Sequence, residues 1–196
     1  MSLYLTSTFY KCQKPLLEKI NPKDYTLAVV TNASDGYLIK PWVDLDIFAL
    51  RRLGFRLKML DLRKSHSLEA FYNNKSINGI YVAGGNTFYL LELMKKSGFF
   101  EFLSNNIKNY LYIGTSAGSI VCCENIDLIK YIDKPLKDRK YDLFGLKIVE
   151  KLILPHFATY PFKNGYAKMF EDSSFNSDKV IKLSDYQALW IEDVGI

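Results

Sequence analysis

The sequence predicts an α/β fold in which a parallel β-sheet carries helices on both faces. Short apolar runs rich in β-branched and aromatic residues alternate along the chain with segments whose apolar residues recur at helical spacing. Turn-forming clusters of Gly, Asn, Asp and Ser separate the two kinds of segment. This alternation is typical of βαβ units. We therefore expect the 196 residues to form a single domain, 1–196, with a sizeable core.

The first half of the chain supplies most of the predicted elements. The run 25–31 is a strong strand candidate, because it is mainly apolar and ends in the turn-forming residues 32–36. Residues 42–53 predict a helix, and Gly54 suits its C-terminal cap. The apolar stripe expected on that helix consists of Trp42, Leu45, Phe48, Ala49 and Leu53. The other strands expected here are 3–6, 55–60 and 76–82, and the other helices are 11–20, 67–72, 88–96 and 99–109.

The second half of the chain is less regular. The run 110–113 predicts a strand, and a helix-compatible segment follows the small residues 114–118. Residues 131–151 are largely polar and broken, which predicts a loop or a small excursion. Further apolar runs with strand character lie at 148–154, 180–183 and 188–191.

Composition narrows the functional classes. The net charge of +5 is mild and the lysines are scattered, so no basic patch indicates a nucleic-acid partner. No apolar run approaches the roughly 20 residues of a membrane span. The N-terminus lacks the basic and then apolar layout of a secretory signal. We therefore expect a cytoplasmic protein, monomeric or homodimeric, with no membrane partner.

The cysteines and histidines restrict the chemistry further. Cys12, Cys122 and Cys123 include no C-x-x-C spacing, which is typical of reduced, mostly buried thiols. His66 and His156 are the chain's two histidines, so a His-rich metal site is excluded. We expect no metal and no cofactor.

The most informative stretch is Gly114-Thr-Ser-Ala-Gly118, a G-x-S-x-G pattern between a predicted strand and a predicted helix. A serine on such a turn is held in a strained conformation with its hydroxyl clear of the chain. The two glycines remove side chains that would collide in so sharp a bend. Ser116 is therefore the candidate nucleophile, against the plainer interpretation of a βα turn with incidental small residues.

A serine nucleophile needs a base, and usually an acid that orients the base. His156 follows the apolar run 148–154 and is the preferred base, whereas His66 lies in a polar stretch. Asp185, after the run 180–183, is favoured as the acid over Asp133 in the polar loop. Two further carboxylates, Glu192 and Asp193, follow the last predicted strand.

The glycine-rich turn after residue 82 is a second candidate site. Gly84, Gly85 and Asn86 lack both Walker-type and G-x-G-x-x-G spacing, so a phosphate-binding role is weakly indicated. Their better use is as an oxyanion hole, with the Ala117 N–H as a second donor. A turn that needs glycine only for packing is the simpler alternative.

Three blocks of sequence together resemble the peptidase E (aspartyl dipeptidase) and cyanophycinase family of serine peptidases. These are Val82-Ala-Gly-Gly-Asn-Thr-Phe-Tyr-Leu-Leu91, Tyr112-Ile-Gly-Thr-Ser-Ala-Gly-Ser119 and Leu154-Pro-His-Phe157. The resemblance covers most of the chain. It implies a three-layer, flavodoxin-like and class I glutamine amidotransferase-like α/β sandwich with a mostly parallel sheet.

The resemblance also implies a function. Ser116 would be the nucleophile, His156 the general base and Asp185 or Asp133 the acid, with no metal. Family members of the aspartyl dipeptidase type hydrolyse dipeptides with an N-terminal aspartate, held by a basic residue downstream of the histidine. That segment here offers Lys163 and Lys168 but no arginine.

The leading hypothesis is therefore a serine-type peptidase that hydrolyses short peptides, in particular dipeptides with an N-terminal aspartate, through an acyl-enzyme on Ser116. One alternative is a non-catalytic module that binds a small acidic ligand in the same cleft. Another is an α/β-hydrolase-like esterase, although 196 residues is short for that fold.

Overall fold

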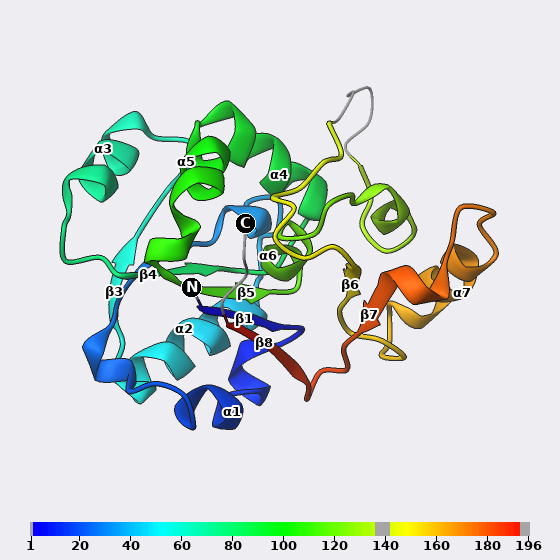
Figure 1. The fold of residues 1–196 in the computed structure, drawn as a ribbon, viewed down its shortest axis with the longest axis horizontal. Helices are drawn as coiled ribbons and strands as arrows, with labels where there is room; N and C mark the ends of the chain where they lie inside the picture. The colour runs from blue at the N-terminus through cyan, green and yellow to red at the C-terminus, as the bar shows by residue number, and fades with distance from the viewer. Residues whose placement is uncertain (1, 136–141, 193–196) are drawn as a thin grey trace.

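A computed structural model describes residues 2–135 and 142–192. Its central feature is a six-stranded sheet in the order β3-β2-β4-β5-β1-β8 (Figure 1). Neighbouring strands are parallel except at one edge, where β8 runs antiparallel to β1. The strands of this sheet are β1 (Ser2–Thr6), β2 (Thr26–Val30), β3 (Arg56–Met59), β4 (Gly79–Val82), β5 (Leu111–Thr115) and β8 (Ala188–Glu192).

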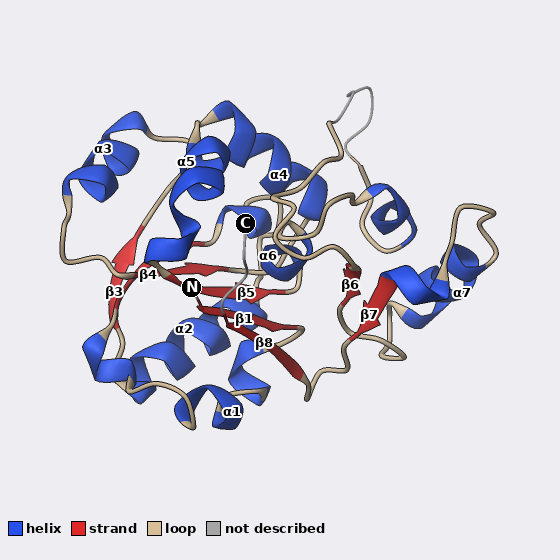
Figure 2. Ribbon diagram, in the orientation of Figure 1, coloured by secondary structure: helices blue, strands red, loops and turns tan. Residues whose placement is uncertain are grey.

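Helices cover both faces of the sheet and complete three layers. Helices α1 and α2 lie on one side, and α3, α4, α5 and α6 lie on the other (Figure 2). The α-helices are α1 (Lys14–Leu17), α2 (Pro41–Leu53), α3 (Ser65–Asn73), α4 (Thr87–Lys96), α5 (Phe99–Asn106), α6 (Ala117–Ile120) and α7 (Lys163–Phe170). The 3₁₀ turns are Phe9–Lys11, Pro22–Asp24, Asn32–Ser34, Ile107–Asn109, Asp127–Tyr131 and Ser177–Lys179. The predicted α/β class with a mostly parallel sheet is confirmed.

Two apolar cores lie on the two faces of the sheet. Successive side chains of a strand point to opposite faces, so Leu3 and Leu5 enter the core under α3–α6, whereas Tyr4 enters the core over α1 and α2. In β5, Tyr112 enters the core under α3–α6 and Ile113 enters the core over α1 and α2. Burial on both faces explains why these strands appear in the sequence as continuous apolar runs.

Two predicted helices differ from the structure. The helix expected over 11–20 is a 3₁₀ turn followed by the single-turn α1. Pro15 lacks a backbone N–H and is tolerated only in the first turn, so the helix begins beside it. Helix α2 has the expected length and ends at Gly54 in the left-handed conformation, but Leu45 and Phe48 of its predicted stripe are exposed.

The buried face of α2 is made instead by Val43, Asp46, Ala49 and Leu50. The predicted stripe was wrong because it took Leu45 and Phe48 for core residues and left out Val43 and Leu50, and the face that is buried includes a carboxylate.

A second, two-stranded parallel sheet holds β6 (Leu152–Leu154) beside β7 (Val180–Lys182), with α7 between them in the chain. In Figure 1 it lies to the right of the main sheet, past the end of β1 and the beginning of β8. The sequence did not predict α7. None of the described helices is long and apolar enough to cross a membrane.

Candidate active site

Ser116 lies at a sharp turn between β5 and α6, at the carboxyl end of a central strand. Its backbone has φ 51° and ψ −109°, which is strained for a residue other than glycine. The turn is held by the Ser116 N–H, which donates to the Thr6 carbonyl at 2.9 Å. A side chain at Gly118 would bring a Cβ within 2.1 Å of the Val82 carbonyl oxygen. The G-x-S-x-G spacing therefore reflects close packing of α6 on β4.

Ser119, one helical turn later, fastens this turn to the sheet. Its buried hydroxyl lies 2.8 Å from the carbonyl oxygens of both Thr6 and Gly114, and it accepts a hydrogen bond from the Thr6 N–H at 3.1 Å. Because Thr6 belongs to β1 and Gly114 to β5, one hydroxyl links β1 to the strand that ends in the Ser116 turn.

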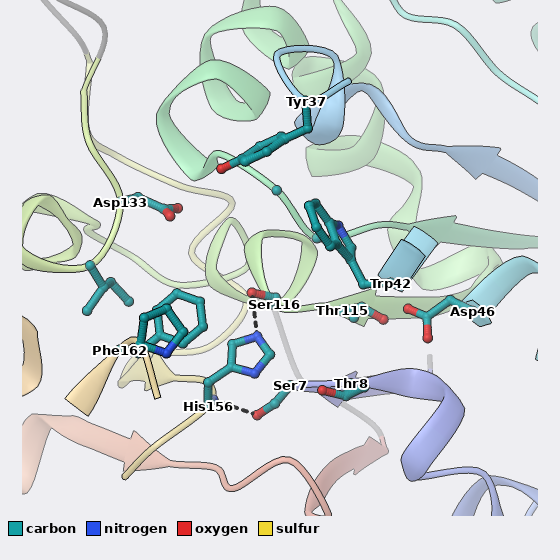
Figure 3. A pocket seen from close by; sticks show the side chains of 14 residues that line it. Ser7, Thr8, Tyr37, Trp42, Asp46, Thr115, Ser116, Asp133, His156 and Phe162 are labelled. Carbon is teal, nitrogen blue, oxygen red and sulfur yellow. Dashed lines mark hydrogen bonds between the residues drawn. The ribbon is translucent and has the colours of Figure 1, made fainter. Parts of the chain in front are cut away.

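His156 follows β6 and reaches back over the main sheet to Ser116. Its backbone has φ 57°, and its N–H donates to the Ser7 hydroxyl at 3.0 Å (Figure 3). The imidazole stacks on Phe162 with 4.7 Å between ring centroids. In this orientation Nε2 lies 3.1 Å from the Ser116 Oγ and Nδ1 lies 2.7 Å from the Asp185 Oδ1.

Asp185 is held on both of its oxygens. Oδ1 faces the imidazole, and Oδ2 accepts a hydrogen bond from Lys11 Nζ at 2.9 Å. Burial alone would raise the pKa of Asp185, but the hydrogen bonds from Lys11 and His156 outweigh it and keep that pKa below the usual value. The carboxylate is therefore ionised where it meets the ring.

The electrostatics suit His156 to accept a proton. Burial lowers the pKa of the imidazole, an effect that the hydrogen bond to Asp185 opposes in part. A neutral ring that donates from Nδ1 to Asp185 has Nε2 free to accept the Ser116 hydroxyl proton. This is the geometry of a serine nucleophile with its general base.

The glycine-rich turn lies directly against the serine. A Cβ added at Gly84 would stand 3.0 Å from the Ser116 Cβ, and one at Gly85 would stand 2.2 Å from the Ala33 carbonyl oxygen. Within the described ranges, the N–H groups of Gly84, Gly85 and Ala117 donate to no other protein group. They remain available to a developing oxyanion.

Comparison with known proteins identifies the family of this chain. The model of peptidase family S51 matches residues 6–196. The chain belongs to peptidase family S51. The uncharacterized peptidase Lin0382 of Listeria innocua is 31% identical over 198 residues, which covers 98% of this chain and 93% of that protein. Peptidase E of Nostoc is 33% identical over 129 residues, covering 62% of this chain and 52% of that protein.

The fold of this S51 peptidase is shared with solved structures. The crystal structure of a candidate peptidase E from Listeria monocytogenes superposes with a TM-score of 0.86 at 28% identity, covering 97% of this chain and 93% of that one. A peptidase from an acI-B1 Actinobacterium gives a TM-score of 0.62 at 21% identity, covering 97% and 82%. The resemblance to peptidase E is thereby confirmed.

Asp133 and Glu192, the other acid candidates among the described residues of the S51 peptidase, do not contact His156. Asp133 accepts hydrogen bonds from the N–H and hydroxyl of Thr87 at the start of α4. Glu192 accepts from the Trp190 indole, and Asp193 lies outside the described residues. Asp185 is thus the carboxylate that the structure brings to the imidazole.

Asn86 has a different position from the one expected. Its N–H donates to the Ala33 carbonyl at 2.8 Å, its side-chain oxygen caps α4 at the Tyr89 N–H, and its amide donates to the Lys134 carbonyl. It lines a neighbouring hollow and not the cavity at Ser116. Asn86 holds the glycine turn and does not offer its groups to a substrate.

A cavity of about 450 Å³ opens beside Ser116. No lysine or arginine of the described chain lines it, and Lys163 and Lys168 are exposed residues of α7 that are not part of its lining. The described residues also contain no cluster of three or more His, Cys, Asp or Glu side chains arranged to hold a metal. The lining combines aromatic Tyr37, Trp42 and Phe162, hydroxyl-bearing Ser7, Thr8 and Thr115, and the carboxylates Asp46 and Asp133.

Sequence reasoning missed three residues of this site. Lys11 and Phe162 carry no local signal, because each acts only through a residue far along the chain. Asp46 did carry a local signal, because it lies three residues from both Val43 and Ala49, at helical spacing on the buried face of α2. A carboxylate at a core-facing position indicates a functional site.

Proposed function

We propose that this S51 peptidase is a serine peptidase that hydrolyses short peptides through an acyl-enzyme on Ser116. The observation that carries the proposal is the continuous path of hydrogen bonds from Ser116 through His156 to Asp185, at 3.1 and 2.7 Å. The roles are those of a nucleophile, a general base and an orienting carboxylate.

The first half of the reaction forms the acyl-enzyme. The Ser116 oxygen attacks the peptide carbonyl carbon while His156 Nε2 takes the hydroxyl proton. The N–H groups of Gly84, Gly85 and Ala117 stabilise the oxyanion, and Asp185 stabilises the imidazolium. The C–N bond then breaks, and the proton on Nε2 passes to the leaving amine.

The second half repeats these steps with water. His156 removes a proton from a water molecule, which attacks the ester carbonyl. The bond from carbon to the Ser116 oxygen breaks, and the proton on Nε2 returns to that oxygen. The products are a carboxylic acid and the free enzyme.

The cavity supports a short substrate. A volume of about 450 Å³ is in the range that holds small ligands, and suits a dipeptide better than a folded protein segment. The charge of its lining does not favour an N-terminal aspartate, because no described cation faces the cavity. The cavity therefore gives no support to a preference for acidic residues.

The decisive experiment compares matched alanine variants on a panel of dipeptides, with release of the free amino acids followed by mass spectrometry. Ser116→Ala and His156→Ala should each lose more than about 10³-fold in kcat/KM while unfolding at the wild-type temperature. His66→Ala, which changes an exposed histidine on α3, should keep full activity. Full turnover by Ser116→Ala or His156→Ala would refute the assignments.

Two further measurements separate the alternatives. A serine-directed phosphonate should add its mass to the peptide containing Ser116 in the wild type and not in His156→Ala. A protein that binds peptides but takes up no phosphonate would be a binding module. Faster turnover of simple esters than of any dipeptide would indicate an esterase.

A further inference from the structure

We propose that Asp46 binds a substrate ammonium group inside the cavity, so that this enzyme selects short peptides with positive charge on their N-terminal residue. This inference rests on the proposed function, because it takes the substrate to be a short peptide. It concerns binding, however, and can be tested in a protein that performs no chemistry.

Asp46 is placed by α2 at the cavity wall. It lies one helical turn after Trp42, and both residues line the cavity that opens at Ser116 (Figure 3). The Trp42 indole donates to the Ser34 hydroxyl at 3.2 Å, and that hydroxyl donates to the Gly84 carbonyl at 2.6 Å. This part of the wall is therefore tied to the glycine turn beside the nucleophile.

The carboxylate of Asp46 is buried without a counter-ion. The residue is 1% exposed, and it accepts hydrogen bonds from the Tyr10 N–H at 2.9 Å and the Tyr81 hydroxyl at 2.6 Å. Both donors are neutral, and Asp46 forms no ion pair with any described residue. The Thr115 hydroxyl and the Phe9 N–H are further neutral donors to this carboxylate. Neutral donors do not cancel the charge, and a buried carboxylate that lacks a cation is costly, so a cation beside it in the cavity is favoured.

The rest of the cavity wall also carries negative charge without a lining lysine or arginine among the described residues. Asp133 lies on the opposite side of Ser116 from Asp46 in Figure 3, and no lysine or arginine of the described ranges lines the wall between them. Lys11, the cation of the catalytic group, is bound to Asp185. The rings of Trp42 and Tyr37 add faces that attract cations. An ammonium group supplies the charge that this cavity lacks.

Burial has the expected effect on Asp46. It raises the pKa of the carboxyl group to about 6, and the neutral donors lower it only in part. Such a group is ionised near neutral pH, and a cation from the ligand would favour the ionised form further.

Binding is measured by calorimetry with the Ser116→Ala protein, which cannot form an acyl-enzyme. The ligands are Lys-Ala, its Nα-acetyl, Nε-acetyl and diacetyl forms, and Asp-Ala. We expect Lys-Ala to bind about 10- to 100-fold more tightly than the diacetyl form, the range for a charged hydrogen bond. Loss of affinity on Nα-acetylation identifies the α-ammonium as the bound group, and loss on Nε-acetylation identifies the side chain.

Adding Asp46→Asn to this protein should remove the preference for the ammonium group and leave the Kd of the diacetyl form unchanged. Asp44→Asn, an exposed position on the same helix, is the control and should change neither value. The proposal is overturned if Asp46→Asn binds Lys-Ala as tightly as its parent, if the parent binds Lys-Ala no better than the diacetyl form, or if it prefers Asp-Ala. The last two comparisons need no variant at Asp46, so they decide the matter even if Asp46→Asn does not fold.

Discussion

Replacing Asp46 by asparagine should make the free protein more stable, relative to the wild type, at alkaline pH than at acid pH. An aspartate in the unfolded chain has a pKa of 3.8, whereas burial raises the pKa of folded Asp46 to about 6. A raised carboxyl pKa means that the folded state holds its proton more tightly. Stability is therefore lost as pH rises from the unfolded pKa through the folded one, and the loss is constant above that.

The magnitude follows from these two pKa values. At about 1.4 kcal/mol per pKa unit, the full cost is about 3 kcal/mol near pH 8 and about 1 kcal/mol near pH 4.5. Asparagine has no such cost. The free energy of unfolding of Asp46→Asn, relative to that of the wild type, should therefore rise by about 2 kcal/mol from pH 4.5 to pH 8. This difference corresponds to roughly 4–8 °C in Tm for a chain of this size.

The assay is urea unfolding of wild type and Asp46→Asn at both pH values, with Tm as a second readout. The amide also changes the hydrogen bonds at this position. Any pH-independent part of that effect cancels when the stability difference between variant and wild type is compared at the two pH values. The titratable neighbours do not contribute, because the pKa of Cys12 is raised to about 11 and that of Tyr81 is raised well above its usual value. His156 and Asp133 face the same cavity and are present in both proteins. An equal stability difference at both pH values would refute the claim that the carboxylate is buried and unpaired.

Further predictions concern the pH dependence of catalysis and the glycine-rich turn. Wild-type kcat/KM should rise with pH through a pKa below the ordinary 6.5 of histidine, because burial lowers the pKa of His156 and only the neutral ring accepts a proton. Lys11→Gln should move this rise in kcat/KM to higher pH, because the lysine charge disfavours protonation of the His156 ring. A pH profile that stays in place would contradict that role of Lys11. Gly84→Ala should fold but lose activity, because its Cβ would press on that of the nucleophile at 3.0 Å. Gly85→Ala should lose stability instead, with φ at 146° and a Cβ 2.2 Å from a backbone oxygen; thermal unfolding and dipeptide turnover would separate the two effects.

Much of the fold could be predicted because its information is local. Strands β2, β4 and β5 are apolar runs between turn residues, and burial on both faces requires that composition. The pairing of β8 with β1 joins the two ends of the chain, and no local pattern determines it. The exposed Leu45 and Phe48 show the same limit, because helical periodicity defines a face but not which face is covered.

The same difference between local and long-range information decides which site residues could be predicted. Ser116 was identifiable because a strained turn requires small neighbours, which leaves a sequence pattern. The choice of Asp185 over Asp133 was not decided by sequence, because Asp185 lies in a turn between β7 and β8 that tertiary packing brings to the imidazole. Lys11 was missed for the same reason, since its contact with Asp185 spans 174 positions along the chain.

The buried carboxylate of Asp46 and the partly buried carboxylate of Asp185 show how environment separates roles within one site. Asp185 has Lys11 and the imidazole beside it, so its charge is compensated and its pKa is held low, as a group that must stabilise an imidazolium requires. Asp46 has neutral donors, so its charge is balanced only when a cation enters. An aspartate side chain in the same cavity would add an anion facing Asp46 and Asp133 without a described cation to offset either. Coulomb repulsion at low dielectric makes that arrangement unfavourable, and so the charge of the cavity argues for amines and against acidic substrates.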